Sequence, residues 1–340
     1  MNLTILKDTV GRRDFFKRLA LGGLTILYGC SKDSVSPNGN NNQYDPEPDP
    51  PPPSTTKVAV YKTQNRSEGV QKVMEMLDFP PMSGKHVVVK PNFNTADPAP
   101  ASTHNDTLSQ LITEIKNRGA SQVTLAERSY QNFNQVITEK NIDDMANNLG
   151  FTIQHLENDD YTVFNREDLH WNSEFRLPKT ISDADYIVST CCLKTHHTGV
   201  ITMSLKLSVG ILPSSHMSEL HASSRINSMI AEINLAYKPK LIIMDGVKTF
   251  IDGGPSHGTV KDGNVIVAGT NRIAIDAVGT AILKDLGSTR VNGKIFELEQ
   301  IKRAVELNLG IKTPDQIEFI TSDDVSSEYA NRLTDILMQG

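Results

Sequence analysis

Short runs of β-branched and other apolar residues alternate with longer amphipathic stretches from residue 58 onward. This alternation is typical of a parallel sheet whose strands are joined by helices. Several of the runs are apolar at every position, as expected for strands covered on both faces. The expected strands span residues 58–61, 86–90, 122–126, 152–155, 184–190, 240–244 and 264–268, and the expected helices span residues 67–77, 106–118, 134–149, 225–236, 272–285 and 296–307. The sequence therefore predicts an α/β fold, with a mostly parallel sheet flanked by helices in Rossmann-like layers.

A segment of different composition precedes this region. Residues 31–56 are mostly Asn, Asp, Pro and Ser, and they hold seven of the 17 prolines in the chain. Such a segment has too little apolar surface to offset the entropy lost on ordering, and its proline run favours polyproline II. We expect residues 31–56 to be a disordered Pro/Asn-rich tether that is stiff next to the domain. Residues 57–340 are long enough for one large domain or two closely joined domains.

The first thirty residues have the features of an export signal. Arg12 and Arg13 precede an apolar run over residues 19–28, an order that resembles a twin-arginine signal. The run is shorter than the roughly 20 residues that a membrane-spanning helix needs. Residues 27–30 resemble a lipobox, which would make Cys30 the lipidated first residue of the mature chain. We expect residues 1–30 to direct the protein through the twin-arginine export machinery to the periplasmic or cell-envelope face of a membrane. Simple secretion without a lipid, or an ordinary basic first helix, is the alternative.

Composition and missing motifs exclude several function classes. With 34 basic and 40 acidic residues the net charge is −6, which is unfavourable for nucleic-acid binding because phosphates are neutralised by clustered Lys and Arg. Three cysteines cannot form a disulfide scaffold or a four-cysteine site, so the chain has no iron–sulfur motif. Nucleotide binding also has no motif behind it, since no Gly-x-Gly-x-x-Gly or Walker sequence follows the first strand.

Unusual polar residues follow five of the expected strands directly. In an open parallel sheet, ligands bind in the crevice outside the carboxyl ends of the strands. These five strand ends therefore predict one shared site. They carry Lys90 and Asn92, Glu127 and Arg128, Lys194 with His196 and His197, Asp245, and residues 269–272.

Lysines in such a crevice hold phosphate or carboxylate groups as point charges, or act as bases when burial lowers their pKa. We expect Lys90, Asn92 and Lys206 to bind the substrate. Gly254 is added to this set because a glycine-dense loop lets the backbone approach a ligand closely. A simple solvent-facing strand end is the alternative for Lys90, and a flexible hairpin is the alternative for the glycine loop.

The expected catalytic residues are His196, Lys194 and Asp245, with His196 as general acid or base and Asp245 as its partner or as a metal ligand. His196 and His197 are adjacent and would point to opposite sides of an extended chain, so one of them is expected to be structural. Asp276 is expected to cap the helix that it opens, and reaching into the site is the alternative.

A divalent metal, such as zinc or nickel, is a second possibility for this site. Its candidate ligands are His196, His216, His257 and Asp245, since imidazoles and carboxylates suit both metals. Their spacing matches no recognised motif, so ordinary surface histidines are the default. Cys191 and Cys192 are expected to be buried small hydrophobes, with a redox pair as the alternative.

Taken in order, these motifs resemble the domain of unknown function 362 family. The resemblance covers about residues 58–320 and implies the α/β fold and a site at these positions, but no settled reaction. Leu207 stands where the family usually has Asn, and the acidic residue before the Gly-Pro pair lies closer to it than in the family. Many relatives add a cysteine-rich ferredoxin-like segment that this chain lacks. The matching residues are Lys90-Pro91-Asn92, Lys194-Thr195-His196, residues 202–210, His216, Asp245-Gly246, Gly254-Pro255 with Gly258, and residues 275–278.

These observations lead to one functional hypothesis and one alternative. The leading hypothesis is an exported, membrane-tethered enzyme that binds an anionic small molecule, a phosphate or carboxylate, at the strand carboxyl ends, with or without a metal. The alternative is a solute- or metal-binding lipoprotein without turnover. A purely structural or adhesive role would leave the clustered lysines and histidines without an explanation.

Overall fold

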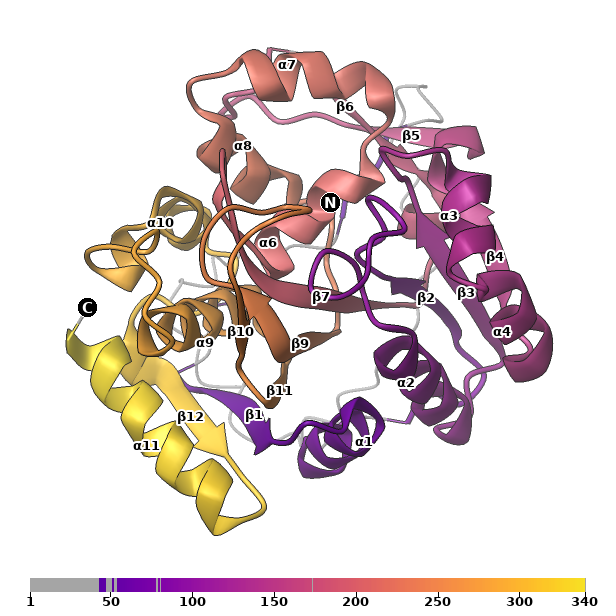
Figure 1. The fold of residues 1–340 in the computed structure, drawn as a ribbon. Coiled ribbons are helices and arrows are strands. Elements are labelled where there is room, and N and C mark those ends of the chain that lie inside the picture. Colours follow the sequence, from indigo (N-terminus) through magenta and orange to yellow (C-terminus); the bar gives the residue numbers. More distant parts are fainter. Residues whose placement is uncertain are drawn as a thin grey trace, which may run out of the picture. The chain divides into compact units, whose positions relative to one another are not determined.

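A mixed ten-stranded sheet forms the centre of the described part of the chain (Figure 1). The computed structural model describes residues 43–46, 51, 54–77, 79, 81–172 and 174–339, so the predicted export signal and Cys30 lie outside the described residues. In spatial order the main strands are β12 (Ile317–Ile320), β1 (Thr56–Lys62), β11 (Val265–Gly269), β9 (Leu241–Phe250), β7 (Tyr186–His196), β2 (His86–Lys90), β3 (Gln122–Glu127) and β4 (Thr152–His155). Two short strands extend the sheet, β10 (Val260–Asp262) beside β9 and β8 (Val200–Thr202) beside β7. β5 (Tyr161–Phe164) and β6 (Phe175–Pro178) form a separate two-stranded sheet.

The sheet is mostly parallel, as the sequence predicts. β9, β7, β2, β3 and β4 run in one direction, and β12 is parallel to β1. β11 is the exception among the main strands, because it is antiparallel to both β1 and β9. Its last residue, Gly269, pairs with Ile242 near the start of β9. The prediction that residues 269–272 join the shared site is therefore wrong, since they lie at the opposite edge. There Arg272 donates hydrogen bonds to the carbonyls of Asn234 and Tyr237 at 2.5 and 2.6 Å.

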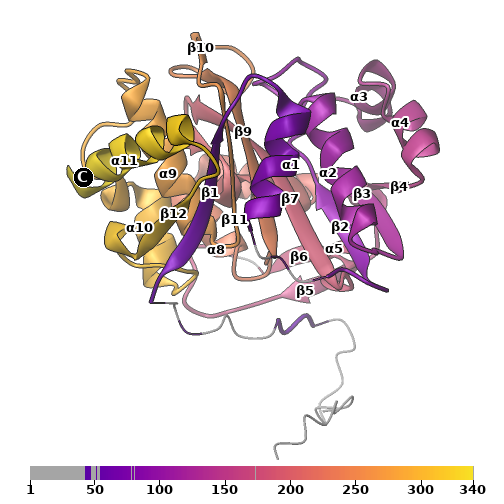
Figure 2. The same ribbon diagram turned by 90° about the horizontal axis from the view of Figure 1, so that it is seen from below.

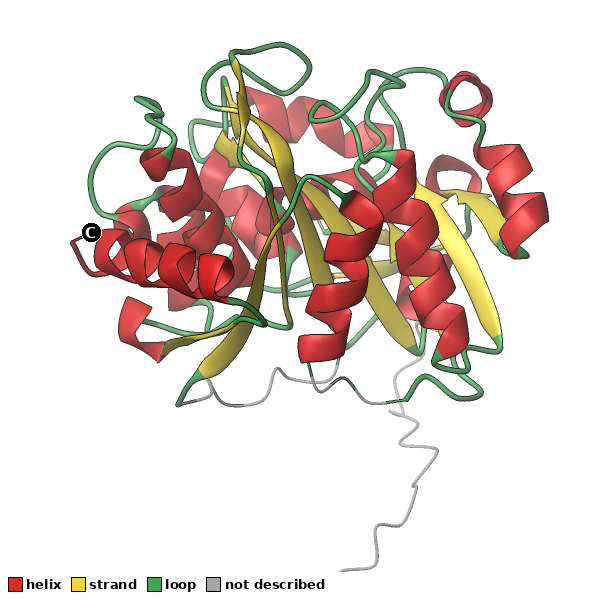
Figure 3. Cartoon of the chain, turned by 60° about the horizontal axis from the view of Figure 1, so that its bottom comes forward, coloured by secondary structure: helices red, strands yellow, loops and turns green. Residues whose placement is uncertain are grey.

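Helices cover both faces of the sheet (Figures 2 and 3). Alternate residues of each strand enter different cores: Val58 and Val60 of β1 belong to one buried cluster, and Ala59 belongs to the other. The helices on the Ala59 side are α1 (Arg66–Met76), α2 (Asn105–Asn117), α3 (Phe133–Glu139) and α4 (Ile142–Leu149). The remaining helices are α5 (Lys179–Ser182), α6 (Ser204–Leu207), α7 (Met217–Ala222), α8 (Ile226–Ile233), α9 (Arg272–Asp285), α10 (Glu299–Glu306) and α11 (Asp324–Gln339). Short 3-10 turns occur at Leu156–Asn158, Ser208–Ile211, Ser214–His216, Ile295–Glu297 and Pro314–Gln316.

Several boundaries differ from the predicted ones for identifiable reasons. The predicted helix over residues 134–149 is broken into α3 and α4 because Asn141 adopts a left-handed conformation with φ of 54°. β7 continues to His196 and β9 continues to Phe250, each six residues beyond the predicted end. Polar side chains therefore lie inside these two strands and not after them, which changes the direction in which they point.

The segment predicted to be a tether contacts the domain where it is described. Gln43 forms a parallel bridge with Val163 of β5, and the Tyr44 amide donates to the Val163 carbonyl at 2.7 Å. β1 begins at Thr56, the last residue of the predicted tether. Among the residues that the structure describes, no helix combines the length and apolar character needed to cross a bilayer.

Candidate functional site

A pocket of about 500 Å³ lies at the carboxyl ends of β2, β3 and β7. Five of the residues predicted for the site line it together, although they come from distant parts of the sequence. They are Lys90, Asn92, Lys194, His196 and Lys206. Parallel neighbouring strands bring their ends to one edge, which is why the strand-end argument located this pocket.

A buried ion pair between Lys90 and Glu127 forms part of the pocket lining. The Lys90 Nζ lies 2.6 Å from Glu127 Oε1, and the two side chains are 1% and 2% exposed. The other carboxylate oxygen of Glu127 accepts the Phe93 amide at 2.9 Å. Burial lowers the pKa of Lys90, and Glu127 opposes that change. A Cβ at Gly210 would lie 2.7 Å from both partner atoms, so this glycine leaves room for the pair. Glu127, which was predicted at the shared site without a specific role, thus compensates the charge of Lys90.

Lys194 and Lys206 supply the remaining lysine ammonium groups. Lys194 is buried and donates to the carbonyls of Ala101 at 2.5 Å and Pro255 at 3.0 Å. Lys206 lines the pocket from α6 and has neither a hydrogen bond nor an ion pair with any residue the structure describes. Burial, and then the positive charge of Lys194, lowers the pKa of Lys206 to about 8. Lys206 is therefore a desolvated cation without a counter-ion among the described residues.

Asp276 holds the short helix that carries Lys206. Its buried carboxylate accepts the amides of Ser204 at 2.7 Å and Leu205 at 3.0 Å, at the start of α6. The predicted role of capping its own helix is wrong, because Asn271 caps α9 and Asp276 lies one turn inside it. Charge at a helix N-terminus and two amide donors both favour the ionised carboxylate. Burial nevertheless raises the pKa of Asp276 to about 7.

We expect this shift to appear in the pH dependence of stability. A carboxyl group whose pKa rises from 3.8 to about 7 on folding keeps its proton in the native state when the unfolded state has lost it. The wild-type free energy of unfolding should therefore fall, relative to Asp276→Asn, as the pH rises through this range. Urea unfolding of both proteins between pH 4 and 8 measures the difference. A constant difference across the range would contradict the assignment.

His196 is a neutral hydrogen-bond donor in this geometry. Its Nδ1 accepts the amides of Thr198 and Gly199, each at 3.0 Å, which places the ring proton on Nε2. Burial, followed by the positive charge of Lys206, lowers the pKa of His196 to about 2. The general-base role predicted for His196 does not fit this arrangement, because Nδ1 already accepts two amides and Nε2 carries the proton, so the neutral ring has no nitrogen free to accept another.

His197 presents the opposite tautomer to the same pocket. Its Nδ1 donates to the Gly254 carbonyl at 2.8 Å, which leaves Nε2 of the neutral ring as an acceptor. The two imidazoles stack with centroids 4.7 Å apart and planes inclined by 15°. The prediction that only one of them serves the site fails because β7 ends at His196, so the alternation of a strand does not reach His197.

Gly254 shapes the site through its backbone and is not part of the pocket lining, whereas its neighbours Pro255 and Ser256 are. Its φ is +71°, and a Cβ there would lie 2.0 Å from the Thr195 carbonyl oxygen. Only glycine fits this close approach of the loop to β7. Gly254 is therefore not in direct contact with the pocket as predicted. Its carbonyl instead accepts the hydrogen bond that orients His197.

Asp245 lies away from the pocket, so the predicted partnership with His196 is wrong. Its carboxylate accepts from Arg66 Nε at 2.7 Å and from Thr107 Oγ1 at 2.8 Å, which ties α1 and α2 to β9. The prediction failed because β9 continues past Asp245 and turns this side chain toward the helices.

We expect Asp245→Asn to act on stability. It leaves the Arg66 guanidinium, only 10% exposed, without its carboxylate, at a cost of about 3 kcal/mol, the lower end for breaking a buried ion pair. Asp262→Asn is the matched control, because its ion pair with Lys248 is exposed and should contribute less than about 1 kcal/mol. Urea unfolding of both variants decides the point. Equal losses in the two would contradict the structural role of Asp245.

The four predicted metal ligands are not brought together. His216 is buried against Trp171 and accepts the Arg176 amide, while His257 is exposed in the loop before β10. Among the described residues, no group of three or more His, Cys, Asp and Glu side chains is arranged to hold a metal ion. The geometry therefore does not fit the metal site considered from sequence.

The adjacent cysteines are buried free thiols, as predicted. Burial raises the pKa of Cys191 well above its ordinary value and that of Cys192 to about 11. Both side chains therefore stay protonated near neutral pH, and the thiolate that redox chemistry requires is disfavoured.

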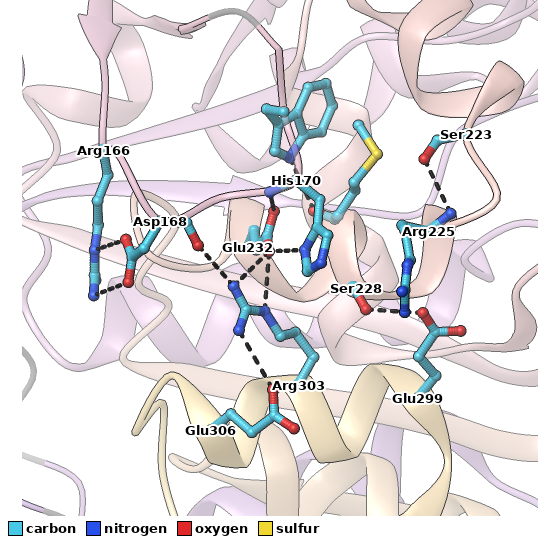
Figure 4. A network of polar contacts seen from close by, with 12 residues as sticks. Arg166, Asp168, His170, Ser223, Arg225, Ser228, Glu232, Glu299, Arg303 and Glu306 are labelled. Carbon is cyan, nitrogen blue, oxygen red and sulfur yellow. Dashed lines mark hydrogen bonds and ion pairs between the residues drawn. The ribbon is translucent and has the colours of Figure 1, made fainter.

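A second polar cluster, whose residues are not part of the pocket lining, is centred on Glu232 (Figure 4). Glu232 is completely buried and accepts from the backbone and Nδ1 of His170 and from Nε and Nη2 of Arg303. Arg303 also donates to the Asp168 carbonyl at 3.0 Å. These contacts fix the loop between β5 and β6 to α8 and α10, and we assign them to the scaffold.

The pocket differs from that cluster because buried polar atoms in its lining lack partners. Asn92 Oδ1, Arg128 Nε and Thr202 Oγ1 are buried and have no hydrogen-bond partner among the described residues. Buried polar groups are normally hydrogen-bonded to protein, water or ligand. A molecule or water bound in the pocket could complete these three, whereas the other six such atoms among the described residues belong to residues outside the lining.

Comparison with known proteins places these residues in a family. Residues 87–281 match the model described as "Domain of unknown function (DUF362)", and every residue of the pocket lining falls in that range. The thylakoid-associated protein sll1697 of Synechocystis sp. is 31% identical over 117 residues, which are 33% of this chain. This chain covers 36% of that relative, about a third of its length. The lactate racemase apoprotein from Thermoanaerobacterium thermosaccharolyticum is similar in structure, with a TM-score of 0.41 and 13% identity over 82% of this chain and 86% of the other.

Proposed function

Because the chain belongs to the DUF362 family, whose description assigns no function, we propose a function from the pocket itself: it binds an anionic small molecule through a carboxylate or phosphate group. The observation that carries this proposal is the ammonium group of Lys206, which faces the pocket without a counter-ion among the described residues. An anion would relieve the electrostatic cost of burying this charge.

The charge of the whole lining supports the same class of ligand. Four cations, Lys90, Arg128, Lys194 and Lys206, face one carboxylate, Glu127, so the lining carries a net charge of +3 with neutral histidines. The chain as a whole carries −6. A positive crevice in an acidic protein concentrates anions locally, because field lines are focused by its low-dielectric walls.

Two of the three histidines in the lining, His196 and His197, support an enzymatic role for the pocket. His196 offers an Nε2 proton to a ligand oxygen, beside the Lys206 charge, and this pair would stabilise negative charge that develops there. His197 offers an unprotonated Nε2 that can accept a proton. We assign His197 as the base, and Lys206 and His196 as the groups that hold the anion. Metal assistance is not part of this proposal.

A thermal-shift screen of the full chain tests the proposal, followed by product analysis for each hit. Binding to the native state alone raises the free energy of unfolding by RT ln(1 + [L]/Kd), so carboxylates or phosphates should raise the Tm in a concentration-dependent way. A panel in which neutral analogues stabilise as well as the anions would contradict the proposal. Stoichiometric retention of an anion without any product would favour the solute-binding lipoprotein over the enzyme.

We also propose that the protein is exported and anchored through Cys30. The support is the order of Arg12 and Arg13, the apolar run over residues 19–28 and the lipobox-like end at Cys30. Cys30→Ser should move the protein from the membrane fraction to the soluble envelope fraction, and replacement of both arginines by lysine should retain it in the cytoplasm. Fractionation and immunoblotting provide the readout. Unchanged distribution of both variants would overturn this proposal.

A further inference from the structure

Besides its cationic residues, the pocket lining includes apolar side chains, which we call the apolar wall. Leu207 at the end of α6, Val209 in the following 3-10 turn and Met217 at the start of α7 line it, and Pro255 lines it from the loop after β9. Tyr130, which is 85% exposed, also belongs to the lining. An exposed aromatic ring at a pocket offers a large apolar face at little entropic cost to a ligand that reaches it.

The volume of the pocket exceeds what a small inorganic anion needs. Cavities of about 300–1,000 Å³ are typical of pockets that enclose ligands of drug size, and this one measures about 500 Å³. A phosphate or acetate ion at Lys206 would leave the apolar wall exposed to water. The ligand that fills the pocket therefore has a body as well as a charged head.

The unsatisfied atoms specify a further group on that body. Asn92 Oδ1 can only accept a hydrogen bond, so its partner must be a donor. Arg128 Nε can only donate, and another nitrogen of the same guanidinium already contacts Met217 Sδ at 3.3 Å, on the apolar side. A hydroxyl or amine near the head would satisfy Asn92, and an acceptor oxygen would satisfy Arg128.

We infer that the ligand is an amphiphilic anion, in which a carboxylate or phosphate head is held at Lys206, an apolar body lies against Leu207, Val209 and Met217, and a hydroxyl or amine reaches Asn92. This inference rests on the proposed anion-binding function and narrows its ligand class. Leu207 adds an apolar side chain to the lining directly beside Lys206, which places the apolar wall next to the proposed position of the head.

Calorimetric titration of the full chain with matched compounds tests the inference. Phenylacetate should bind at least about tenfold more tightly than acetate, because the buried phenyl group contributes more than the 1.4 kcal/mol that tenfold requires. Mandelate, which adds a hydroxyl, should bind more tightly than phenylacetate. Comparison of phenyl phosphate with phenylacetate identifies the preferred head group. Phenyl phosphate should also bind more tightly than inorganic phosphate, as the inference requires.

Two failures can be told apart. If acetate and inorganic phosphate bind as tightly as their phenyl counterparts, the inference is overturned while the anion site stands. If neutral benzyl alcohol binds as tightly as phenylacetate, or if no anion binds, the proposed function itself fails.

Met217→Gln should lower the ratio of phenylacetate to acetate affinity, and Tyr130→Ala is a second variant on the protein surface with the same expected direction. Met338→Gln, at an exposed position of α11, is the matched control and should leave the ratio unchanged.

Discussion

Lys206→Met weakens binding of a carboxylate or phosphate to the full chain by about 10- to 100-fold, in line with the roughly 1.5–3 kcal/mol of a hydrogen bond to a charged group. Methionine has a similar length and can lie in the same apolar surroundings without an unmet hydrogen-bonding group. Titration calorimetry at pH 7 with the best anion from the screen measures the effect. Lys302→Met is the control, since Lys302 is exposed on α10 and pairs with Glu297.

The same substitution should raise stability, and this separates lost binding from lost folding. The pKa of Lys206 falls from 10.5 in the unfolded chain to about 8 in the fold, so the native state disfavours the charged form. The free energy of unfolding of the wild type is therefore reduced below pH 8, and it rises as the pH increases from about 8 to 10.5. Lys206→Met has no charge to desolvate, so at pH 7 its free energy of unfolding should be higher than that of the wild type. A variant that binds as well as the wild type, or that loses both stability and binding, would contradict the role assigned to Lys206.

Glu127→Gln should cost about 3–5 kcal/mol of unfolding free energy, because it leaves the buried charge of Lys90 without its counter-ion. The amide keeps the shape of the side chain but cannot neutralise a lysine that is 1% exposed. Urea unfolding at pH 7 measures the loss. The cost should shrink at high pH, where Lys90, whose pKa is already lowered by burial, gives up its proton more readily.

A double variant gives the control for this second prediction. Lys90→Met combined with Glu127→Gln removes the unpaired charge and should recover much of the stability, since a buried ion pair can often be replaced by apolar residues at little cost. If Glu127→Gln alone lowers the free energy of unfolding by less than about 1 kcal/mol, the ion pair does not contribute to stability as its burial implies.

The sheet and the position of the pocket were predictable from sequence because they depend on local patterns. Alternating apolar runs identified the parallel strands, and parallel strands share an edge, so Lys90, Asn92 and Lys194 met as expected. The strand-end prediction failed for residues 269–272, since an apolar run does not reveal whether its strand is parallel or antiparallel. It failed for Asp245 because β9 runs on, and the end of a strand is fixed by its pairing partner.

The chemistry of the site depends on contacts between residues far apart in the chain. The protonation of His196 is set by amides in the turn beyond β7, and the position of Lys206 is set by Asp276, seventy residues later in the sequence. The pairing of Glu127 with Lys90 joins two strands that sequence alone does not place side by side. Residue types therefore led to the prediction of an anion site, but the roles proposed for the individual residues required the fold.

Chemical labelling of Lys206 tests the central claim most directly. The full chain is treated with limiting acetic anhydride at pH 7.5, with and without a saturating anion from the screen, and the modified lysines are quantified by mass spectrometry. A pKa of about 8 leaves a reactive fraction of unprotonated amine, so Lys206 should be labelled readily in the free protein and protected by the anion. Labelling of exposed Lys72 should be the same in both samples. Equal labelling of Lys206 with and without the anion would contradict the account, because the bound anion would then lie elsewhere.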